Sequence, residues 1–160
     1  MKSELTLDEK LQLLTLKNDW QTEDCGGKIQ SVFLADGPHG LRKIGEDGQT
    51  VKCTAYPNIS TLACTWSKEM AGLMGSSIAD DCIENDVDVL LAPGVNLKRT
   101  PLCGRNFEYY SEDPFLTGKT AAAYIKGVQS NGVGVSVKHF AANNQEVNRM
   151  ENDSRVSQRA

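Results

Sequence analysis

Short apolar runs alternate with longer amphipathic stretches along the chain, and this order predicts an α/β fold. Buried strands are expected at 32–35, 87–97 and 132–139, where valine, leucine and small residues predominate. Helices are expected from Ser67 onward and again over 113–131. Strands that alternate with helices in this way form parallel sheets with right-handed crossovers.

Local signals place the starts of three helices. Thr6 and Glu9 have the spacing of a capping box, Ser67 is suited to cap the second helix, and Asp113 precedes Pro114 at the start of the third. The apolar positions then repeat at helical spacing, as Leu7, Leu11 and Leu14 in the first helix and Ala71, Met74, Ile78 and Cys82 in the second.

The chain contains fewer strands than a complete parallel fold requires. Its 160 residues suffice for one domain with a core, yet the third predicted strand has no obvious neighbour after it. Ser157 is a plausible helix cap, but only three residues follow it. We therefore expect residues 1–160 to be part of a larger, truncated α/β domain.

Charge and hydropathy exclude several classes of protein. The net charge of −4 and the isoelectric point near 5.2 argue against a nucleic-acid partner. No apolar run approaches the roughly 20 residues that cross a bilayer, so no membrane partner is expected. The first 14 residues lack the core of a signal peptide, which favours a cytoplasmic location.

Cysteine and histidine spacing gives no support for a metal or a cofactor. The five cysteines show no short metal-binding spacing, and His39 and His139 are the only histidines. The glycines of 132–136 lie inside a strand and lack the third glycine of a dinucleotide loop. We expect reduced, mostly buried thiols, and a thiol enzyme that uses Cys103 with His139 stays open as a minor alternative.

Each predicted strand ends in groups that suit a polyhydroxylated ligand. The carboxyl ends of the strands of a parallel α/β barrel converge on one face. There a carboxylate accepts hydrogen bonds from adjacent hydroxyls, while Arg, Lys and His donate to others. The candidate binding residues are Asp36, Arg42, Arg105, Lys138, His139 and Arg149.

Some of these residues also have simpler interpretations. Asp36 in an Asp-Gly-Pro sequence could only form a turn, and Arg105 could form an ordinary ion pair with Glu108 that braces a loop. Lys138 and His139 favour function more strongly, because two such residues at the end of a buried strand are costly without partners.

Several stretches together resemble the N-terminal part of glycoside hydrolase family 3, of the β-glucosidase type. They include "LADGPHGLRK", "LLAPGVNLKRTPLCGRNFEYYSEDPFLTG" and "AAAYIKGVQSNGVGVSVKHFAANNQEVNR", and the likeness covers nearly the whole chain. The resemblance implies the first three βα units of a (β/α)8 TIM-type barrel. The rest of the barrel and a following domain would be its missing partners.

The resemblance also implies a role for each candidate residue. Asp36 is similar to the carboxylate that binds sugar hydroxyls in the −1 subsite, Arg42 and Arg105 to arginines of the same pocket, and Lys138 and His139 to a pair of hydroxyl donors. Arg149 is similar to a further pocket arginine. The ligand would be a small β-glycoside or an oligosaccharide.

The implied reaction is hydrolysis of terminal non-reducing β-D-glycosyl residues by a retaining mechanism with two carboxylates. The family's nucleophile and acid/base lie further along the chain, so no catalytic residue is expected within these 160 residues, and the isolated chain is expected to be inactive. A non-catalytic or vestigial carbohydrate-binding module is the alternative function.

Overall fold

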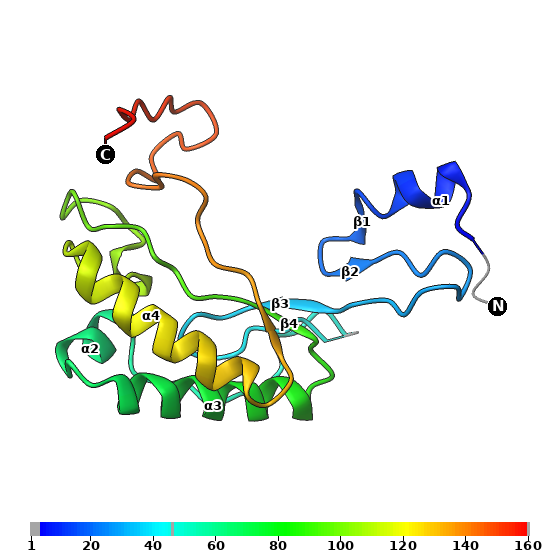
Figure 1. The fold of residues 1–160 in the computed structure, drawn as a ribbon, viewed down its shortest axis with the longest axis horizontal. Helices are drawn as coiled ribbons and strands as arrows, with labels where there is room; N and C mark the ends of the chain where they lie inside the picture. Colours follow the sequence, from blue (N-terminus) through cyan, green and yellow to red (C-terminus); the bar gives the residue numbers. More distant parts are fainter. Residues whose placement is uncertain (1–3, 46, 160) are drawn as a thin grey trace.

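Three parallel strands form the centre of the molecule, as expected for an α/β fold. The computed structural model describes residues 4–45 and 47–159. Strands β3 (Leu34–Asp36), β4 (Val89–Leu91) and β5 (Gly134–Val135) form a sheet in the order β3-β4-β5. Asp36 lies opposite Leu91 in the register, so the carboxyl ends of β3 and β4 are level. Figure 1 shows this sheet beside the helices.

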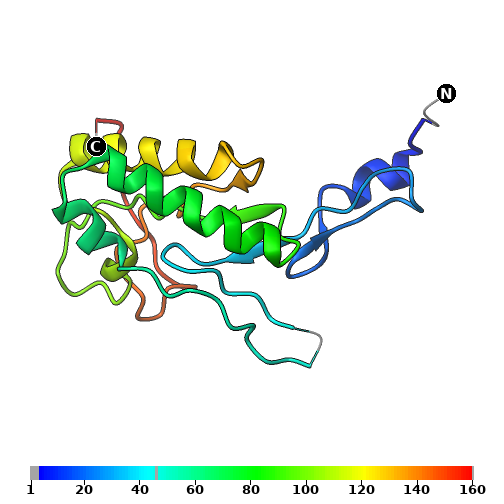
Figure 2. The same ribbon diagram turned by 90° about the horizontal axis from the view of Figure 1, so that it is seen from below.

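Helices α3 (Lys68–Glu84) and α4 (Pro114–Gln129) connect the strands and lie side by side against the sheet (Figures 1 and 2). Glycines permit their close approach, because a Cβ on Gly75 or Gly127 would overlap the backbone of the facing helix. The apolar face predicted for α3 is confirmed. Its residues Ala71, Met74, Ile78 and Cys82 are buried, and they belong to the same core cluster as Leu90, Tyr124 and Val128.

The strands are shorter than the apolar runs predicted. Strand β4 ends at Leu91 because Pro93, two residues on, lacks the N–H that a ladder needs. The two chains nevertheless continue side by side, since Lys138 N–H donates to the Pro93 carbonyl at 3.0 Å and Val95 N–H donates to the Lys138 carbonyl at 2.7 Å. The segments after β4 and β5 therefore reach the same region.

The predicted helix caps are confirmed. Thr6 and Glu9 form the capping box of α1 (Leu7–Gln12), Ser67 accepts a hydrogen bond from the Met70 N–H, and Asp113 caps α4. The side chains that cap α1, α3 and α4 are therefore those that their residue type and spacing predict.

The N-terminal segment extends away from the sheet (Figure 1). After α1, the strands β1 (Leu16–Asn18) and β2 (Gln21–Thr22) form an antiparallel pair that the sequence reading did not predict. The apolar stripe predicted for the first helix is largely exposed: Leu7 is 72% accessible, and Leu14, which lies beyond the end of α1, is 80% accessible. Within the described chain, no helix is both long and apolar enough to span a membrane.

Two further elements were also absent from the prediction. Helix α2 (Ile59–Cys64) begins after Asn58, whose side chain accepts from the Thr61 N–H at 2.9 Å. The 3-10 turn η1 (Asn106–Glu108) lies in the loop between β4 and α4. Residues 47–57 lie in a loop that projects from the molecule in Figure 2.

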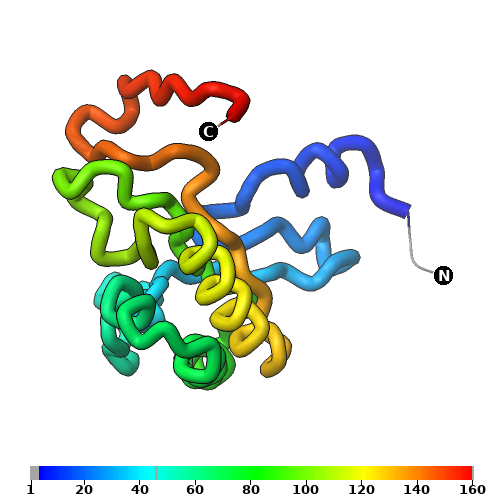
Figure 3. Tube along the Cα trace, turned by 60° about the vertical axis from the view of Figure 1, so that its left-hand side comes forward, coloured from blue at the N-terminus to red at the C-terminus, as the bar shows by residue number. Residues whose placement is uncertain are grey.

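The segment after β5 runs as a loop and continues into the C-terminal segment at the top of Figure 3. A helix was expected to begin at Ser157. Residues 157–159 contain no helix, and Ala160, the last residue of the expected helix, lies outside the described residues. The absence of a signal peptide was inferred in part from residues 1–3, which also lie outside them.

Candidate functional site

Asp36 and Lys138 form the centre of the candidate site. Asp36 is the last residue of β3, and Lys138 follows β5 on a segment aligned with Gly94. The Lys138 Nζ lies 2.5 Å from Asp36 Oδ1, and the two side chains are 13% and 28% exposed. The ends of the first and third strands of the sheet are thus joined by an ion pair that a ligand can reach.

A tight turn after β3 returns Arg42 to Asp36. Arg42 N–H donates to the Asp36 carbonyl at 2.7 Å. Gly37 has φ of +136°, and a Cβ there would overlap the carbonyl of Gly40, so this turn requires glycine. The Asp-Gly-Pro sequence therefore does form a turn, and the same turn positions Asp36 and Arg42 on one cleft.

Glu108 is a buried carboxylate that the sequence reading treated only as a loop brace. It is 3% exposed, it forms an ion pair with Arg105 Nε, and its Oε2 lies 3.6 Å from Lys138 Nζ. Burial acts to lower the pKa of Arg105, but the hydrogen bond and charge of Glu108 outweigh it and raise that pKa. One carboxylate thus holds two of the predicted binding residues.

The His139 imidazole is bonded at both ring nitrogens. Nε2 lies 2.6 Å from an Arg105 guanidinium nitrogen, and Nδ1 lies 2.7 Å from the Tyr109 hydroxyl. Its backbone N–H donates to Asn96 Oδ1 at 3.0 Å. Burial, followed by the charges of Arg105 and Lys138, lowers the pKa of His139, so the ring is neutral near pH 7.

Arg149 and Arg42 are exposed, and 54% of the Arg149 side chain is accessible. Arg149 lies 3.2 Å from Glu146, which also faces Arg105 at 3.9 Å and accepts from Asn143 Nδ2 at 2.9 Å. Burial opposes ionisation of Glu146, but the Asn143 hydrogen bond and the two arginines together lower its pKa.

Alternating charges therefore run through the site from one strand end to the loop after β5. Their order is Asp36, Lys138, Glu108, Arg105, Glu146 and Arg149. Lys138, Arg105 and Arg149 each face a carboxylate, so the charges within this series balance. Such an array offers both donors and acceptors, which suits the paired hydroxyls of a neutral sugar.

A polar cleft of about 540 Å³ lies at this array. It contains four of the six predicted residues, and its lining includes Asp36, Arg42, Arg105, Arg149 and Glu108. His139 lines an adjoining hollow that shares Arg105 and Arg149 with the cleft. Phe107 and His39 meet edge to face across the same cleft, with ring centroids 5.7 Å apart.

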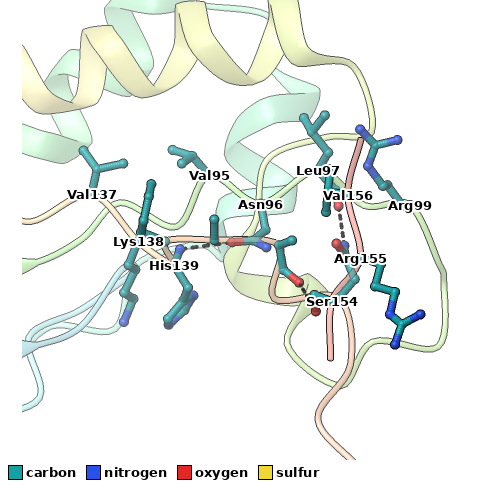
Figure 4. Close-up of a pocket in the computed structure, with 14 residues that line it drawn as sticks. Val95, Asn96, Leu97, Arg99, Val137, Lys138, His139, Ser154, Arg155 and Val156 are labelled. Carbon is teal, nitrogen blue, oxygen red and sulfur yellow. Dashed lines mark hydrogen bonds between the residues drawn. The ribbon is translucent and has the colours of Figure 1, made fainter. Parts of the chain in front are cut away.

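A second cavity, of about 660 Å³, lies between the segments that follow β4 and β5 and the C-terminal segment (Figure 4). Lys138 and His139 also line this cavity, but its wall includes Val95, Leu97, Val137 and Val156, so it is more apolar than the cleft at Asp36. Because a sugar presents mainly hydroxyls, the cleft at Asp36 is the better candidate for a sugar site.

The thiols show no relation to this array. Cys103 is buried and its Sγ faces the Asn143 carbonyl at 3.8 Å, whereas the nitrogens of His139 face Arg105 and Tyr109. The expected burial is found for Cys25, Cys82 and Cys103, while Cys64 is exposed. Across residues 4–45 and 47–159, no group of three or more potential ligands is placed to hold a metal ion.

Comparison with known proteins gives consistent matches over nearly the whole chain. Residues 2–157 match the sequence model described as the glycosyl hydrolase family 3 N terminal domain. The chain is 47% identical to thermostable beta-glucosidase B of Acetivibrio thermocellus over 98% of its own length and 22% of that protein. It is 46% identical to an exo-alpha-(1->6)-L-arabinopyranosidase of Bifidobacterium longum, with the same coverage.

Solved structures agree with the fold. A family 3 beta-glucosidase of Bifidobacterium adolescentis is similar with a TM-score of 0.90 and 45% identity, over 98% of this chain and 23% of that one. Beta-glucosidase 3B of Thermotoga neapolitana, solved in complex with glucose, is similar with a TM-score of 0.81 and 44% identity over 91% of this chain and 23% of its own. The chain thus spans less than a quarter of the length of these relatives.

Proposed function

The chain belongs to glycosyl hydrolase family 3. On that premise we propose that it forms the sugar-binding part of a β-glucosidase-like hydrolase. Asp36, Arg42, Arg105, Lys138, His139 and Arg149 would line the −1 subsite. The observation that supports this most is the contact of Asp36 with Lys138 at 2.5 Å, at the ends of two different strands and beside a polar cleft.

We also propose that the sheet is the start of a barrel. In the described sheet, β3 and β5 are the outer strands and α3 and α4 lie on one face. Eight such βα units close into a barrel whose strand ends carry the active site. Under this proposal, residues 1–160 are the first three βα units, and the remaining strands and a following domain complete the site.

The proposed contribution is binding and not bond cleavage. A retaining glycosidase needs a nucleophilic carboxylate and an acid/base carboxylate about 5–5.5 Å apart on either side of the glycosidic bond. Asp36 is ion-paired with Lys138, and Glu108 is buried against Arg105 and Lys138. Neither carboxylate is placed to attack an anomeric carbon, so the proposed nucleophile and acid/base lie outside these residues.

Hydroxyl binding by this array would also assist the reaction of the complete protein. Hydrogen bonds to the ring hydroxyls that strengthen as the oxocarbenium-like transition state develops lower the barrier. Because the ion pairs hold Lys138 and Arg105 in place beforehand, little reorganisation accompanies that change. The proposed sugar is a terminal β-D-glycosyl residue, with glucose as the first ligand to test.

Two measurements on the 160-residue chain test this function. With p-nitrophenyl β-D-glucopyranoside we expect release of nitrophenol no faster than the buffer blank, because no nucleophile is available. Titration with glucose should shift the backbone amide signals of Asp36, Arg105 and Lys138 in a ¹H–¹⁵N spectrum. Clear turnover would contradict the assignment of binding alone, and unchanged amide signals up to 100-fold molar excess would contradict the sugar site.

A further inference from the structure

The direction of the hydrogen bonds around His139 is fixed by a neighbour that can only donate. The Arg105 guanidinium has no acceptor, and one of its terminal nitrogens lies 2.6 Å from His139 Nε2. Two N–H groups cannot face each other at this distance, so Nε2 must present its lone pair. A neutral imidazole whose Nε2 accepts must carry its proton on Nδ1.

The other end of the same network is fixed by a group that can only accept. An ionised Glu146 carboxylate faces the side-chain amide of Asn143 at 2.9 Å, which identifies that amide atom as the nitrogen. The same nitrogen lies 2.8 Å from the Tyr109 hydroxyl and donates its second hydrogen there. The Tyr109 oxygen therefore accepts from Asn143 and, at 2.7 Å, from His139 Nδ1–H.

Tyr109 is suited to this role by its burial. The residue is fully buried, and burial raises the pKa of its hydroxyl to about 12, so the group stays neutral. A neutral phenol oxygen with two incoming donors is a fixed acceptor on the far side of the ring from Arg105. Sequence patterns did not single out this tyrosine, because nothing in "GRNFEYY" shows that its hydroxyl turns toward a loop 30 residues later.

We propose that Tyr109 is a positioning residue that holds His139 as the neutral, Nδ1-protonated tautomer, whose Nε2 lone pair accepts from Arg105 and so orients that guanidinium beside the sugar site. The assignment deepens the proposed function, since it makes Lys138 and Arg105 the donors of the site and His139 an acceptor that orients Arg105. The sequence-based expectation was the reverse, with His139 as a donor.

The charges that face His139 come from three parts of the fold and agree with a neutral ring. Arg105 after β4 and Lys138 beside the ring disfavour a second proton, and burial acts in the same direction. Glu108 and Asp36 oppose them, but each is already engaged by Lys138 or Arg105. The tautomer itself follows from the geometry and does not depend on this balance.

Nitrogen NMR of the ¹⁵N-histidine-labelled chain, without sugar, tests the assignment directly. The two-bond ¹H–¹⁵N pattern distinguishes the tautomers, and His39 serves as the second signal in every spectrum. At pH 7.5 we expect His139 in the wild type to be mainly Nδ1-protonated. A wild-type spectrum that shows mainly Nε2-protonated or cationic His139 overturns the proposal without any variant.

Variants then test the part played by Tyr109. In Tyr109→Phe the buried Nδ1–H loses its acceptor, and a buried donor without a partner is destabilising. The ring should therefore leave its contact with Arg105, and since imidazole in water prefers the Nε2-protonated form, the Nδ1-protonated fraction should fall at least twofold. Tyr110→Phe is the matched control, because Tyr110 is equally buried and its hydroxyl has no hydrogen-bond partner among the described residues. An unchanged His139 in Tyr109→Phe, or an equal change in Tyr110→Phe, would overturn the proposed role.

The outcome is independent of the proposed function. If the wild type shows the Nδ1 tautomer but glucose shifts no amide signal, then the positioning of His139 stands and the sugar site fails. If glucose binds but His139 is Nε2-protonated, the sugar site stands and the role of Tyr109 fails.

Discussion

Lys138 and Asp36 are 102 positions apart in the chain, and their side chains meet at 2.5 Å across the end of the central strand of the sheet. The contact joins β3 to the segment after β5 without a direct strand pair between them. It can form only when the parallel sheet is in register, since Asp36 ends β3 and the Lys138 segment follows β4 through its bonds to Pro93 and Val95. The site therefore depends on the fold as a whole.

Replacement of Glu108 by glutamine should destabilise the chain more than an equivalent surface change. The substitution removes the carboxylate that both Arg105 and Lys138 face. Breaking a buried ion pair costs about 3 kcal/mol of stability. The cost is somewhat less here because the Arg105 side chain is partly exposed. Urea denaturation measures the free energy of unfolding. Glu112→Gln, at an exposed position, is the control, and equal effects of both variants would refute the role of Glu108.

The close crossing of α3 and α4 predicts opposite effects of two glycine substitutions in α4. Gly127→Ala places a methyl group against the backbone of Gly72 and should cost about 1–3 kcal/mol of stability. Gly118→Ala meets no atom within 4 Å and should stabilise the helix by up to about 1 kcal/mol. The melting temperatures of both variants, measured by thermal unfolding, test this prediction. An unchanged melting temperature of Gly127→Ala would mean that α3 and α4 lie further apart than the structure shows.

How much of this could be read from the sequence depends on the range of the interaction. Helix caps such as Ser67 and Asp113 act within three residues, so their pattern is visible locally. The strands were also located because apolar runs are local, although β4 and β5 end at Leu91 and Val135, before the predicted runs end at 97 and 139. By contrast, helix α2 begins after Asn58 inside a stretch without clear periodicity and was not predicted.

The network around the predicted binding residues could not be derived in the same way. Glu108 and Tyr109 lie in a loop whose 3-10 turn aims one side chain at Lys138 and the other at His139. Both contacts join the loop after β4 to residues 30 positions away, and only the folded backbone sets them. Residue type suggested hydroxyl binding, but the pairing of Arg105, Lys138 and Arg149 with carboxylates appears only in three dimensions.

The stability of the chain should depend on pH through His139. Burial, with Arg105 and Lys138, lowers its pKa below the value near 6.5 of an unfolded chain, so the unfolded state binds the proton first as the pH falls. This contribution is fully present above pH 6.5 and is lost as the pH falls through the lower folded value.

Urea denaturation between pH 5 and 7.5 measures this effect. His139→Asn should flatten the slope in that window, whereas His39→Asn should leave the slope in place. The carboxyls whose pKa is lowered, among them Glu146, titrate below pH 4.5 and so in a separate window. An undiminished slope in His139→Asn would contradict the assignment of the effect to this ring.

Alkylation separates the sugar site from the alternative of a thiol enzyme. Iodoacetamide should modify the exposed Cys64 of the folded chain well before the buried Cys25, Cys82 and Cys103. Cys103→Ser should bind glucose as the wild type does, because the Cys103 thiol faces a backbone carbonyl and not His139. Mass spectrometry of the modified chain and a glucose titration check the two points, and loss of glucose binding in Cys103→Ser would revive the thiol alternative.

The central claim is that Asp36 and Lys138 together hydrogen-bond a sugar hydroxyl. The affinity of the Asp36→Asn variant for glucose tests this claim most directly. A charge-assisted hydrogen bond contributes about 1.5–3 kcal/mol, so we expect the affinity measured by ¹H–¹⁵N titration to fall at least tenfold. Asp153→Asn, which removes an exposed partner of Arg155, should bind glucose as the wild type does. If Asp36→Asn, still folded, bound glucose as tightly as the wild type, the account of this site would be wrong.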